Sequence, residues 1–152
     1  MKFAADAMLG KLAVWLRLLG FDTSYLRDIE DDMLVDTARE EGRLLLTRDT
    51  VLVKKLAPGE FLFIRDDSPS MQLRQTVREL GLALDESLFF SRCTRCNVLL
   101  KAAEKESVRG KVPEFTFGRM DSFMRCPSCG RVYWRGTHWK RVTDRLREIE
   151  VE

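Results

Sequence analysis

Apolar residues occur in short blocks along the first half of the chain, and the most continuous block is the leucine run 44–46. Gly42 and Arg43 precede this run, and Thr47, Arg48 and Asp49 follow it. A short, unbroken apolar run between a glycine and charged residues is typical of a strand buried on both faces. We therefore expect a central strand of a parallel sheet here, with Asp49 just beyond its carboxyl end.

The neighbouring blocks predict three more strands and four helices around this central strand. The expected strands cover residues 1–5, 22–26 and 61–64, and the expected helices cover 7–19, 32–41, 49–56 and 69–80. Glycines at 20, 42 and 81 are the predicted stops, Asp31 is the predicted cap of the second helix, and Ser68-Pro69 is a start signal. Strands that alternate with helices over short connections indicate an α/β fold with a mostly parallel sheet flanked by helices.

The pattern changes after residue 88, where helical periodicity gives way to two Cys-x-x-Cys pairs and then a terminal helix over about 138–150. We place a domain boundary there, giving units 1–88 and 89–152. The first unit holds 12 Lys and Arg against 16 Asp and Glu, and the second holds 14 against 8. This asymmetry suggests acids that bind cations in one unit and a surface that binds a polyanion in the other, although solvated charge without a partner explains it equally well.

The composition predicts a protein with a sizeable core and no membrane span. The 152 residues are 45% hydrophobic and 33% charged. No apolar run approaches the roughly 18 residues that a spanning helix needs, and the first residues do not resemble a secretory signal. We therefore expect a cytoplasmic location.

All four cysteines fall in the two pairs, Cys93 with Cys96 and Cys126 with Cys129, which are 29 residues apart. Two residues between cysteines let a tight turn direct both sulfurs at one ion, and two such turns complete a tetrahedral shell around zinc. Disulfides or a redox pair are the alternative, but nothing in the sequence indicates secretion. The pattern predicts a structural Zn²⁺ in a zinc ribbon, without a catalytic role.

Asp6, Asp31 and Asp49 each lie where a helix is predicted to begin, and two of them directly follow predicted strands. Each aspartate alone is explained as a helix cap. Together they would concentrate carboxylates at one edge of the sheet, and hard oxygen ligands suit Mg²⁺ or Mn²⁺. Such a site activates water for phosphodiester hydrolysis, and the chain has no Gly-rich phosphate loop that would indicate an NTPase.

Three stretches of the chain resemble a known family. They are 3–6 (FAAD) with 8–22 (MLGKLAVWLRLLGFD), 45–49 (LLTRD), and 126–139 (CPSCGRVYWRGTHW). These residues are similar to the PIN-like RNase domain found at the C-terminus of Mut-seven-type exonucleases, a family that also occurs as stand-alone prokaryotic proteins. The similarity covers nearly the whole chain.

The resemblance implies a PIN-like nuclease core followed by a C-terminal zinc ribbon. It also implies a metal-dependent ribonuclease whose catalytic, metal-binding acids are Asp6, Asp31 and Asp49, with Asp32 in place of Asp31 after a slip of one residue. Further acids of such sites match Asp28 and Asp66. The expected cofactors are a structural Zn²⁺ and a catalytic Mg²⁺ or Mn²⁺, and the expected partner is RNA.

Cations near the acids and near aromatic residues are the candidate RNA contacts. Arg48, and with less reason Lys11, lies beside the proposed acids, where it would bind phosphate or only reduce repulsion. Aromatic residues among cations suit single-stranded RNA, because bases stack and phosphates pair. The candidates in the second unit are Arg131, Arg135, His138 and Trp139. Trp134 is expected to pack the ribbon against the terminal helix instead.

Two other functions fit the same residues. In one, the protein is a non-catalytic RNA- or ribosome-binding module, its acids serve as helix caps, and its basic unit carries the function. In the other, it is a toxin-like nuclease controlled by a partner protein, against which the built-in zinc ribbon argues mildly.

Overall fold

The computed structural model describes residues 1–151, with the backbone alone at 138, 150 and 151. The first part of the chain is a four-stranded, fully parallel sheet with the strand order β2-β1-β3-β4. The strands are β1 (Phe3–Ala5), β2 (Thr23–Tyr25), β3 (Leu44–Thr47) and β4 (Phe61–Phe63). The leucine run thus forms an inner strand, as predicted, and the mixed α/β architecture with a parallel sheet is confirmed.

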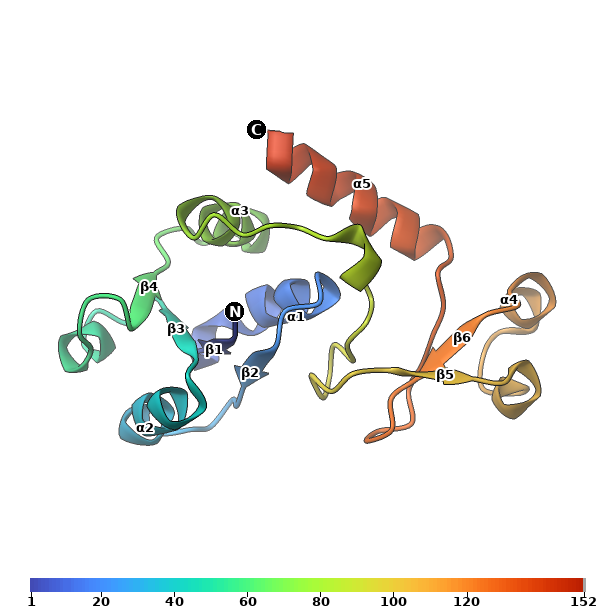
Figure 1. The fold of residues 1–152 in the computed structure, drawn as a ribbon, viewed down its shortest axis with the longest axis horizontal. Helices are drawn as coiled ribbons and strands as arrows, with labels where there is room; N and C mark the ends of the chain where they lie inside the picture. The colour runs from blue at the N-terminus through green and yellow to red at the C-terminus, as the bar shows by residue number, and fades with distance from the viewer. Residues whose placement is uncertain (152) are drawn as a thin grey trace.

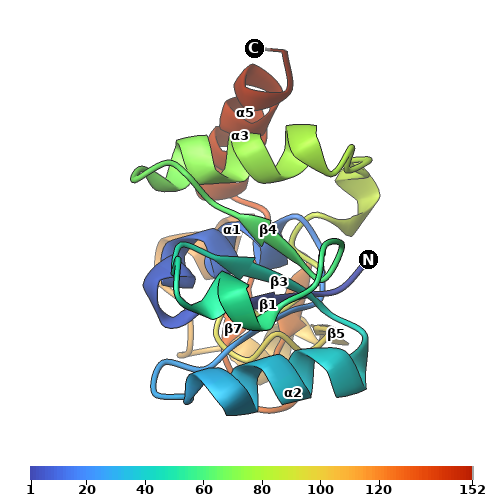
Figure 2. The same cartoon turned by 90° about the vertical axis from the view of Figure 1, so that its left-hand side faces the viewer.

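Helices cover both faces of this sheet (Figure 2). The helices are α1 (Gly10–Leu18), α2 (Asp31–Glu41) and α3 (Pro69–Glu79). Phe3, Ala5 and Leu46 pack in the cluster that contains α1 and α3. Ala4 and Leu45 pack in a second cluster with α2. Because strand side chains alternate with a period of two, inner strands with a helix layer on each face must be apolar throughout.

Most of the helix boundaries follow the predicted signals, with one correction at α2. Ser68 caps α3 by accepting a hydrogen bond from the Met71 amide, and Gly42 ends α2 with a φ of 65°. Asp31 does not cap α2, because it lies inside the first turn, and the preceding Glu30 takes the cap position without a side-chain bond. The negative charge of Asp31 in the first turn still favours the start of the helix through the helix dipole.

Single turns of 3-10 helix replace two of the expected helical segments. The stretch after β1 begins with η1 (Ala7–Leu9) before α1, and the stretch after Asp49 forms η2 (Leu52–Lys55). In both cases an aspartate accepts hydrogen bonds from amides of the following turn. The two aspartates that follow β1 and β3 therefore act as local caps as well as edge residues.

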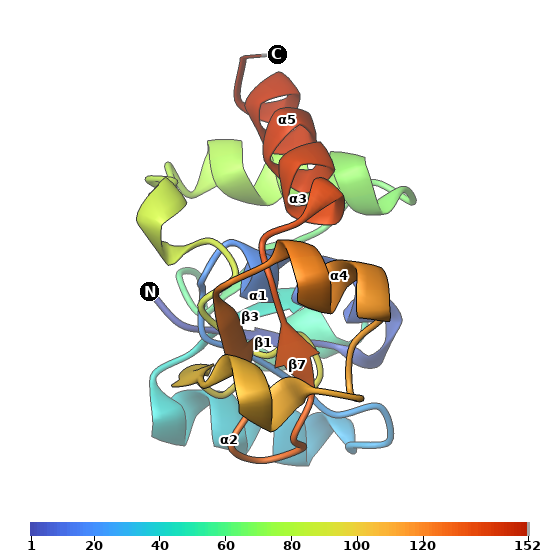
Figure 3. The same ribbon diagram turned by 90° about the vertical axis from the view of Figure 1, so that its right-hand side faces the viewer.

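The second part of the chain is a small antiparallel sheet with the order β5-β6-β7 (Figure 3). Its elements are β5 (Lys101–Ala103), η4 (Lys105–Val108), α4 (Glu114–Arg119), β6 (Phe123–Arg125) and β7 (Val132–Tyr133), and η3 (Glu86–Leu88) precedes it.

No helix among the described residues is long and apolar enough to cross a lipid bilayer.

The terminal helix α5 (Thr137–Val151) returns from the small sheet and packs on the first part of the chain (Figure 1). Val142, Leu146 and Ile149 are buried in the same cluster as Phe3 of β1 and Leu73 of α3. The last helix therefore completes the core of the parallel-sheet unit. The boundary near residue 88 stays a prediction, and α5 connects the two sides of it.

A partly buried ion pair closes the amino end of the parallel sheet. Arg43 donates a hydrogen bond of 2.7 Å to the Asp22 carboxylate, and Asn97 donates one of 2.7 Å to the same oxygen. Burial alone would raise the pKa of Asp22, but the hydrogen bonds from Arg43 and Asn97 outweigh burial and lower it. Asn97 belongs to the first cysteine pair, so this ion pair also joins the two parts of the chain.

Replacing Leu146 by Ala is expected to lower the free energy of unfolding by about 2–4 kcal/mol, because it leaves a cavity where α5 meets α1 and α3. Urea unfolding measures the change. Arg145→Ala, at an exposed position of the same helix, is the control and should change little. Equal effects of the two substitutions would contradict the packing of α5 in this core.

Replacing Asp22 by Asn is expected to cost stability at neutral pH and little in acid. The pKa of Asp22 is lower in the folded than in the unfolded chain, so its contribution is present above the unfolded pKa of about 3.9. That contribution is lost as the pH falls through the folded pKa. Urea unfolding of both proteins between pH 7 and pH 3 should show curves that converge below about pH 4. The exposed Asp121→Asn serves as the control; a constant difference across this range contradicts the role of Asp22.

Candidate active site and metal centre

Asp6 lies buried at the carboxyl end of β1, with 5% of its surface exposed. One carboxylate oxygen accepts hydrogen bonds from the Thr47 hydroxyl at 2.5 Å and the Arg48 amide at 2.9 Å. The other oxygen accepts a bond of 3.0 Å from the Met8 amide. A buried carboxylate needs such donors, because burying a charge without them is costly. Asp6 is therefore fixed in position by the end of β3 and by the turn that follows β1.

The order in which strands are added to the sheet reverses between β1 and β3, and Asp6 and Asp49 follow these two strands. From β1 the chain adds β2 on one side, and then crosses to add β3 and β4 on the other. In open parallel sheets, ligands bind beyond the carboxyl ends of the strands at this reversal point. The Thr47 hydroxyl joins the two acids, because it donates to Asp6 and accepts from the Asp49 amide at 2.9 Å.

The Asp49 carboxylate is held by the turn that follows it. One of its oxygens accepts bonds from the amides of Val51 (2.8 Å) and Leu52 (3.2 Å). These bonds fix the turn that leads into η2. Sequence analysis predicted Asp49 as a start signal for a helix, and it serves as one for this short turn.

Lys55, at the end of η2, lies within the field of three acids. Its ammonium group pairs with the Asp32 carboxylate at 2.7 Å. This hydrogen bond is the main reason that the pKa of Lys55 is raised, and the charges of Asp32, Asp31 and Asp49 raise it further. The charges of Asp31, at the start of α2, and of Asp49, after β3, thus act on the same lysine. Sequence analysis missed Lys55, whose only signal was its place in the turn opened by Asp49.

The acids do not form a ready-made metal cluster. Within the part of the chain that the structure describes, the four cysteines are the only group of three or more metal-binding side chains with mutually close ligand atoms. Asp28 is exposed in the turn after β2. Asp66 follows β4, and its carbonyl accepts a hydrogen bond from Gln72 at 2.9 Å. Among the described residues, the predicted acids thus follow the ends of β1, β2, β3 and β4, but no three of them form a close group.

Arg48 is engaged by the protein itself. Its guanidinium group donates to the backbone carbonyls of Ile64 and Asp66 and pairs with Asp67 at 2.7 Å. These bonds fix the segment between β4 and α3 against the end of β3. Arg48 therefore has a clear structural role at this edge, while its predicted RNA contact stays a prediction.

The four cysteine sulfurs lie within 4.8 Å of one another. The Cys93 and Cys129 sulfurs are 3.8 Å apart. Four thiolates that each bind a tetrahedral zinc ion at roughly 2.3 Å have sulfur atoms about 3.8 Å apart, which matches this distance. The arrangement therefore fits the predicted zinc site.

The two cysteine turns have the same local structure. In each, the amide of the second cysteine donates to the sulfur of the first at 3.4 Å. The next residue has a positive φ, 70° at Asn97 and 79° at Gly130. Glycine takes this conformation freely, and asparagine is the side chain that tolerates it best. Sequence analysis missed the role of Asn97 in this turn.

The pKa values of the thiols show why this cluster favours a cation. Burial alone would raise the pKa of Cys93, but hydrogen bonds from the Tyr133 hydroxyl and from the Cys96 and Arg95 amides lower it to about 6. Burial raises the pKa of Cys96 to about 11, and its hydrogen bond with Cys129 adds to this. One thiolate thus forms readily and opposes the ionisation of its neighbours. A divalent ion removes that repulsion.

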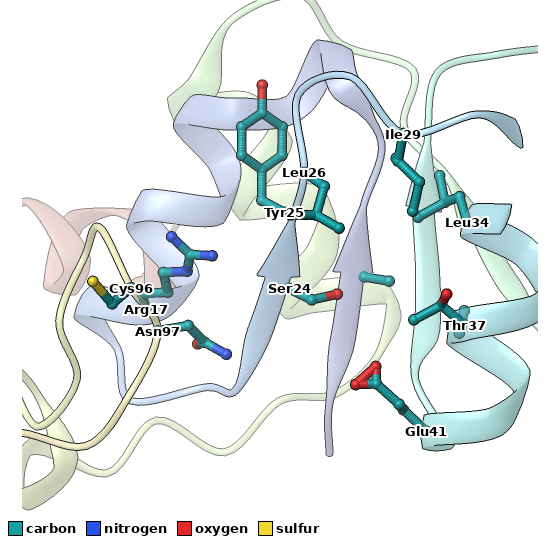
Figure 4. A pocket seen from close by; sticks show the side chains of 12 residues that line it. Arg17, Ser24, Tyr25, Leu26, Ile29, Leu34, Thr37, Glu41, Cys96 and Asn97 are labelled. Atoms are coloured by element: carbon teal, nitrogen blue, oxygen red, sulfur yellow. The ribbon is translucent and has the colours of Figure 1, made fainter. Parts of the chain in front are cut away.

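The first cysteine turn is anchored on the free edge of β2. The buried Arg17 donates to the carbonyls of Thr23 (2.9 Å) and Thr94 (2.8 Å). Asn97 accepts a bond of 2.9 Å from the Thr23 amide. Figure 4 shows Arg17 and Asn97 beside β2, around a cavity of about 340 Å³ that neither Asp6 nor Asp49 lines. These contacts provide hydrogen-bond partners for the Thr23 amide and carbonyl at the sheet edge and attach the first cysteine turn to β2.

The predicted RNA contacts of the second unit lie on either side of β7 and in the first turn of α5. Arg135 is exposed and its guanidinium lies over the Trp139 ring, and Arg131 lies over the Tyr133 ring. Trp139 is half-buried and packs beside Phe90. The side chain of His138 lies outside the described part of the structure.

Trp134 packs inside the small sheet unit. Its ring meets Phe123 edge-on and belongs to the cluster of Val108 and Val112. The expectation that Trp134 packs against the terminal helix is thus corrected, because its described partners lie in the ribbon. The tryptophan of the terminal helix, Trp139, packs instead against Phe90, which lies between η3 and the first cysteine turn.

Comparison with known proteins gives one match. The family model described as Mut7-C RNAse domain matches residues 1–146. No curated protein and no solved structure matches the chain.

The purified protein is expected to contain one zinc ion per chain, and Cys126→Ser is expected to lose it. Serine cannot supply the buried thiolate that completes the four-sulfur shell. Metal analysis of the purified proteins measures the content. Ser122→Ala, an exposed position before β6, should retain zinc. A wild-type protein without zinc, or a Cys126→Ser variant that retains it, would contradict the site.

Proposed function

Because the chain belongs to the Mut7-C RNAse domain family, we propose that it is a metal-dependent ribonuclease that hydrolyses RNA phosphodiester bonds at the carboxyl edge of its parallel sheet. We propose Asp6, Asp31 and Asp49 as the acids of the site, in a PIN-like core, with a zinc ribbon that helps to bind RNA. Beyond the family, the observation that supports this proposal most is the buried Asp6 carboxylate beside Asp49 at the point where the strand order reverses.

The carboxylates keep enough free acceptor sites to hold Mg²⁺ or Mn²⁺. A carboxylate accepts about four hydrogen bonds or ligand contacts. Asp6 uses three of them and Asp49 uses two within the described structure. Mg²⁺ commonly keeps several waters and takes one or two carboxylates together with phosphate oxygens of the substrate. A site of this kind does not require the three acids to touch one another, so the residues fit the ion.

Each residue of the edge has a distinct part in the proposed reaction. When bound, the ion supplies Lewis-acid stabilisation of the phosphate and a water of lowered pKa. Asp6, held by Thr47 and the Arg48 amide, offers its remaining lone pair at a fixed position. Asp49 and Asp31 supply the other carboxylate oxygens. Lys55, whose pKa is raised, stays protonated and limits the repulsion among these acids.

A non-catalytic RNA- or ribosome-binding module is the second candidate. Two observations favour it: the acids form no compact cluster in the described structure, and both Asp6 and Asp49 also serve as caps. In that case the carboxylates stabilise the edge, and RNA binds to basic and aromatic surfaces elsewhere. The two candidates differ in whether removing a carboxylate abolishes cleavage.

The expected result for Asp49→Asn is loss of RNA cleavage by about 100-fold or more, with RNA binding retained, because the amide weakens the hold on the ion that stabilises the phosphate. The assay follows a labelled, partly single-stranded RNA with Mg²⁺, with Mn²⁺, and with EDTA added after zinc loading. Cleavage should require the added metal.

Asp36→Asn is the matched control, because Asp36 is an exposed acid farther along α2. It should cleave like the wild type. Cleavage that survives in Asp49→Asn, as that of a contaminating nuclease would, contradicts the proposed site. No cleavage by the wild type under any of these conditions rejects the ribonuclease and leaves the binding module.

A further inference from the structure

A cavity of about 540 Å³ opens beside the first turn of α1, and both parts of the chain line it. The residues that line it include Lys11, Val14, Trp15 and Arg17 of α1, Tyr25 of β2, and Arg95 of the first cysteine turn. The volume lies in the range of roughly 300–1,000 Å³ that is typical of small-ligand sites.

The cavity adjoins the acidic edge through Tyr25. The Tyr25 hydroxyl donates a hydrogen bond of 2.9 Å to the carbonyl of Ala7, the residue directly after Asp6. A Cβ added at Gly10 would come within 3.0 Å of that hydroxyl and 3.1 Å of the ring. The tyrosine ring is thus held between the backbone of Gly10 and the hydrogen bond to Ala7, and it forms a fixed wall of the cavity.

The walls are aromatic and apolar, and two cations lie at the rim. Trp15 and Tyr25 are half-buried, and 39% of the surface of Val14 is exposed. Lys11 and Arg95 are exposed, and neither side chain takes part in an ion pair within the described residues. Aromatic walls accept the face of a nucleobase, and free cations accept phosphates. This combination differs from the β7–α5 junction, where Arg135 and Trp139 already contact each other.

Arg17 explains why the zinc ribbon contributes to this cavity. Its buried guanidinium donates to the carbonyls of Thr94 at 2.8 Å and Arg95 at 3.3 Å, as well as to Thr23 of β2. The first cysteine turn is therefore fixed with Arg95 at the rim. Arg17 acts here as a positioning residue.

We propose that this cavity binds an unpaired base of the RNA strand, against the rings of Trp15 and Tyr25, with neighbouring phosphates on Lys11 and Arg95. The inference rests on the proposed function for the identity of the polymer. It adds a specificity: a base enters such a cavity only after it has left its stack, so the site selects single-stranded over duplex RNA. It also assigns the ribbon's contact to Arg95 of the first cysteine turn.

The test measures binding in the zinc-loaded, full-length protein carrying Asp49→Asn, without added Mg²⁺, so that cleavage does not interfere. Fluorescence anisotropy follows a labelled single-stranded oligonucleotide and a duplex of the same sequence. Val14→Glu places a negative charge at the exposed wall, and Arg95→Ala removes a rim cation. Both should weaken single-strand binding about tenfold or more, with a much smaller effect on duplex.

Lys11→Ala gives a second readout. It should reduce the slope of log K against log salt by about 0.7 for single strands, as expected for one lost phosphate contact. Val98→Glu, with a similar exposure of 37%, is the control for the added charge, and Lys111→Ala is the control for the lost cation. Both controls should bind within about twofold of the parent, because they touch neither ring nor rim.

Equal losses in Val98→Glu and Val14→Glu, or equal losses on single strands and duplex, overturn the proposal. So does full competition by a free mononucleotide at the concentration of the oligonucleotide, which would make the cavity a nucleotide site. This outcome is separate from that of the ribonuclease assay. If the cavity variants bind and cleave normally, the base site alone is rejected. If the wild type binds RNA here but never cleaves it, the ribonuclease alone is rejected.

Discussion

The carboxyl edge of the sheet depends on the hydrogen bonds that the buried Asp6 carboxylate accepts. It takes one from the Thr47 hydroxyl, one from the Arg48 amide and one from the Met8 amide, and so joins β1 to the end of β3. The same Thr47 hydroxyl accepts from the Asp49 amide, so the turn to η2 starts from a fixed point. Because an unpartnered buried charge is costly, this set of bonds permits little movement of the backbone around Asp6. The placement of Asp49, and through η2 of Lys55, follows from it.

The second constraint is the polar contact between the first cysteine turn and β2. An edge strand exposes unpaired backbone groups, and here Arg17 and Asn97 satisfy those of Thr23. Asn97 takes the positive φ that the cysteine turn requires, and its side chain bonds both Thr23 and Asp22. Asn97 therefore contributes both to the first cysteine turn and to the closed edge of the parallel sheet. Together with α5, these contacts hold the small antiparallel sheet against the parallel-sheet unit.

Features that local sequence determines were predictable, and features that depend on distant contacts were not. The buried strand at 44–46, the cap at Ser68 and the spacing of the cysteines follow from local rules that the structure obeys. The position of Asp31 was wrong by one residue, because Glu30 takes the cap position without a side-chain bond and leaves no signal. The partners of Arg48 and Lys55 lie 16 or more residues away, and long cationic side chains reach many places. The places of Asp6 after β1 and Asp49 after β3 were predicted, but the position of Lys55 near Asp49 was not.

In the proposed enzyme, the separation of the acids couples metal binding to substrate binding. Carboxylates that do not converge hold Mg²⁺ weakly through a few oxygens, and the remaining ligands are waters or phosphate oxygens. Lys55 already balances part of the negative charge, which lowers the attraction for a free cation. RNA held in the adjacent cavity, as proposed, would bring a phosphate to the edge and supply the missing oxygens. Affinity for the ion and affinity for RNA then increase together, because each ligand strengthens the other by the same factor. An ion bound tightly in the absence of RNA would need a different arrangement of the carboxylates.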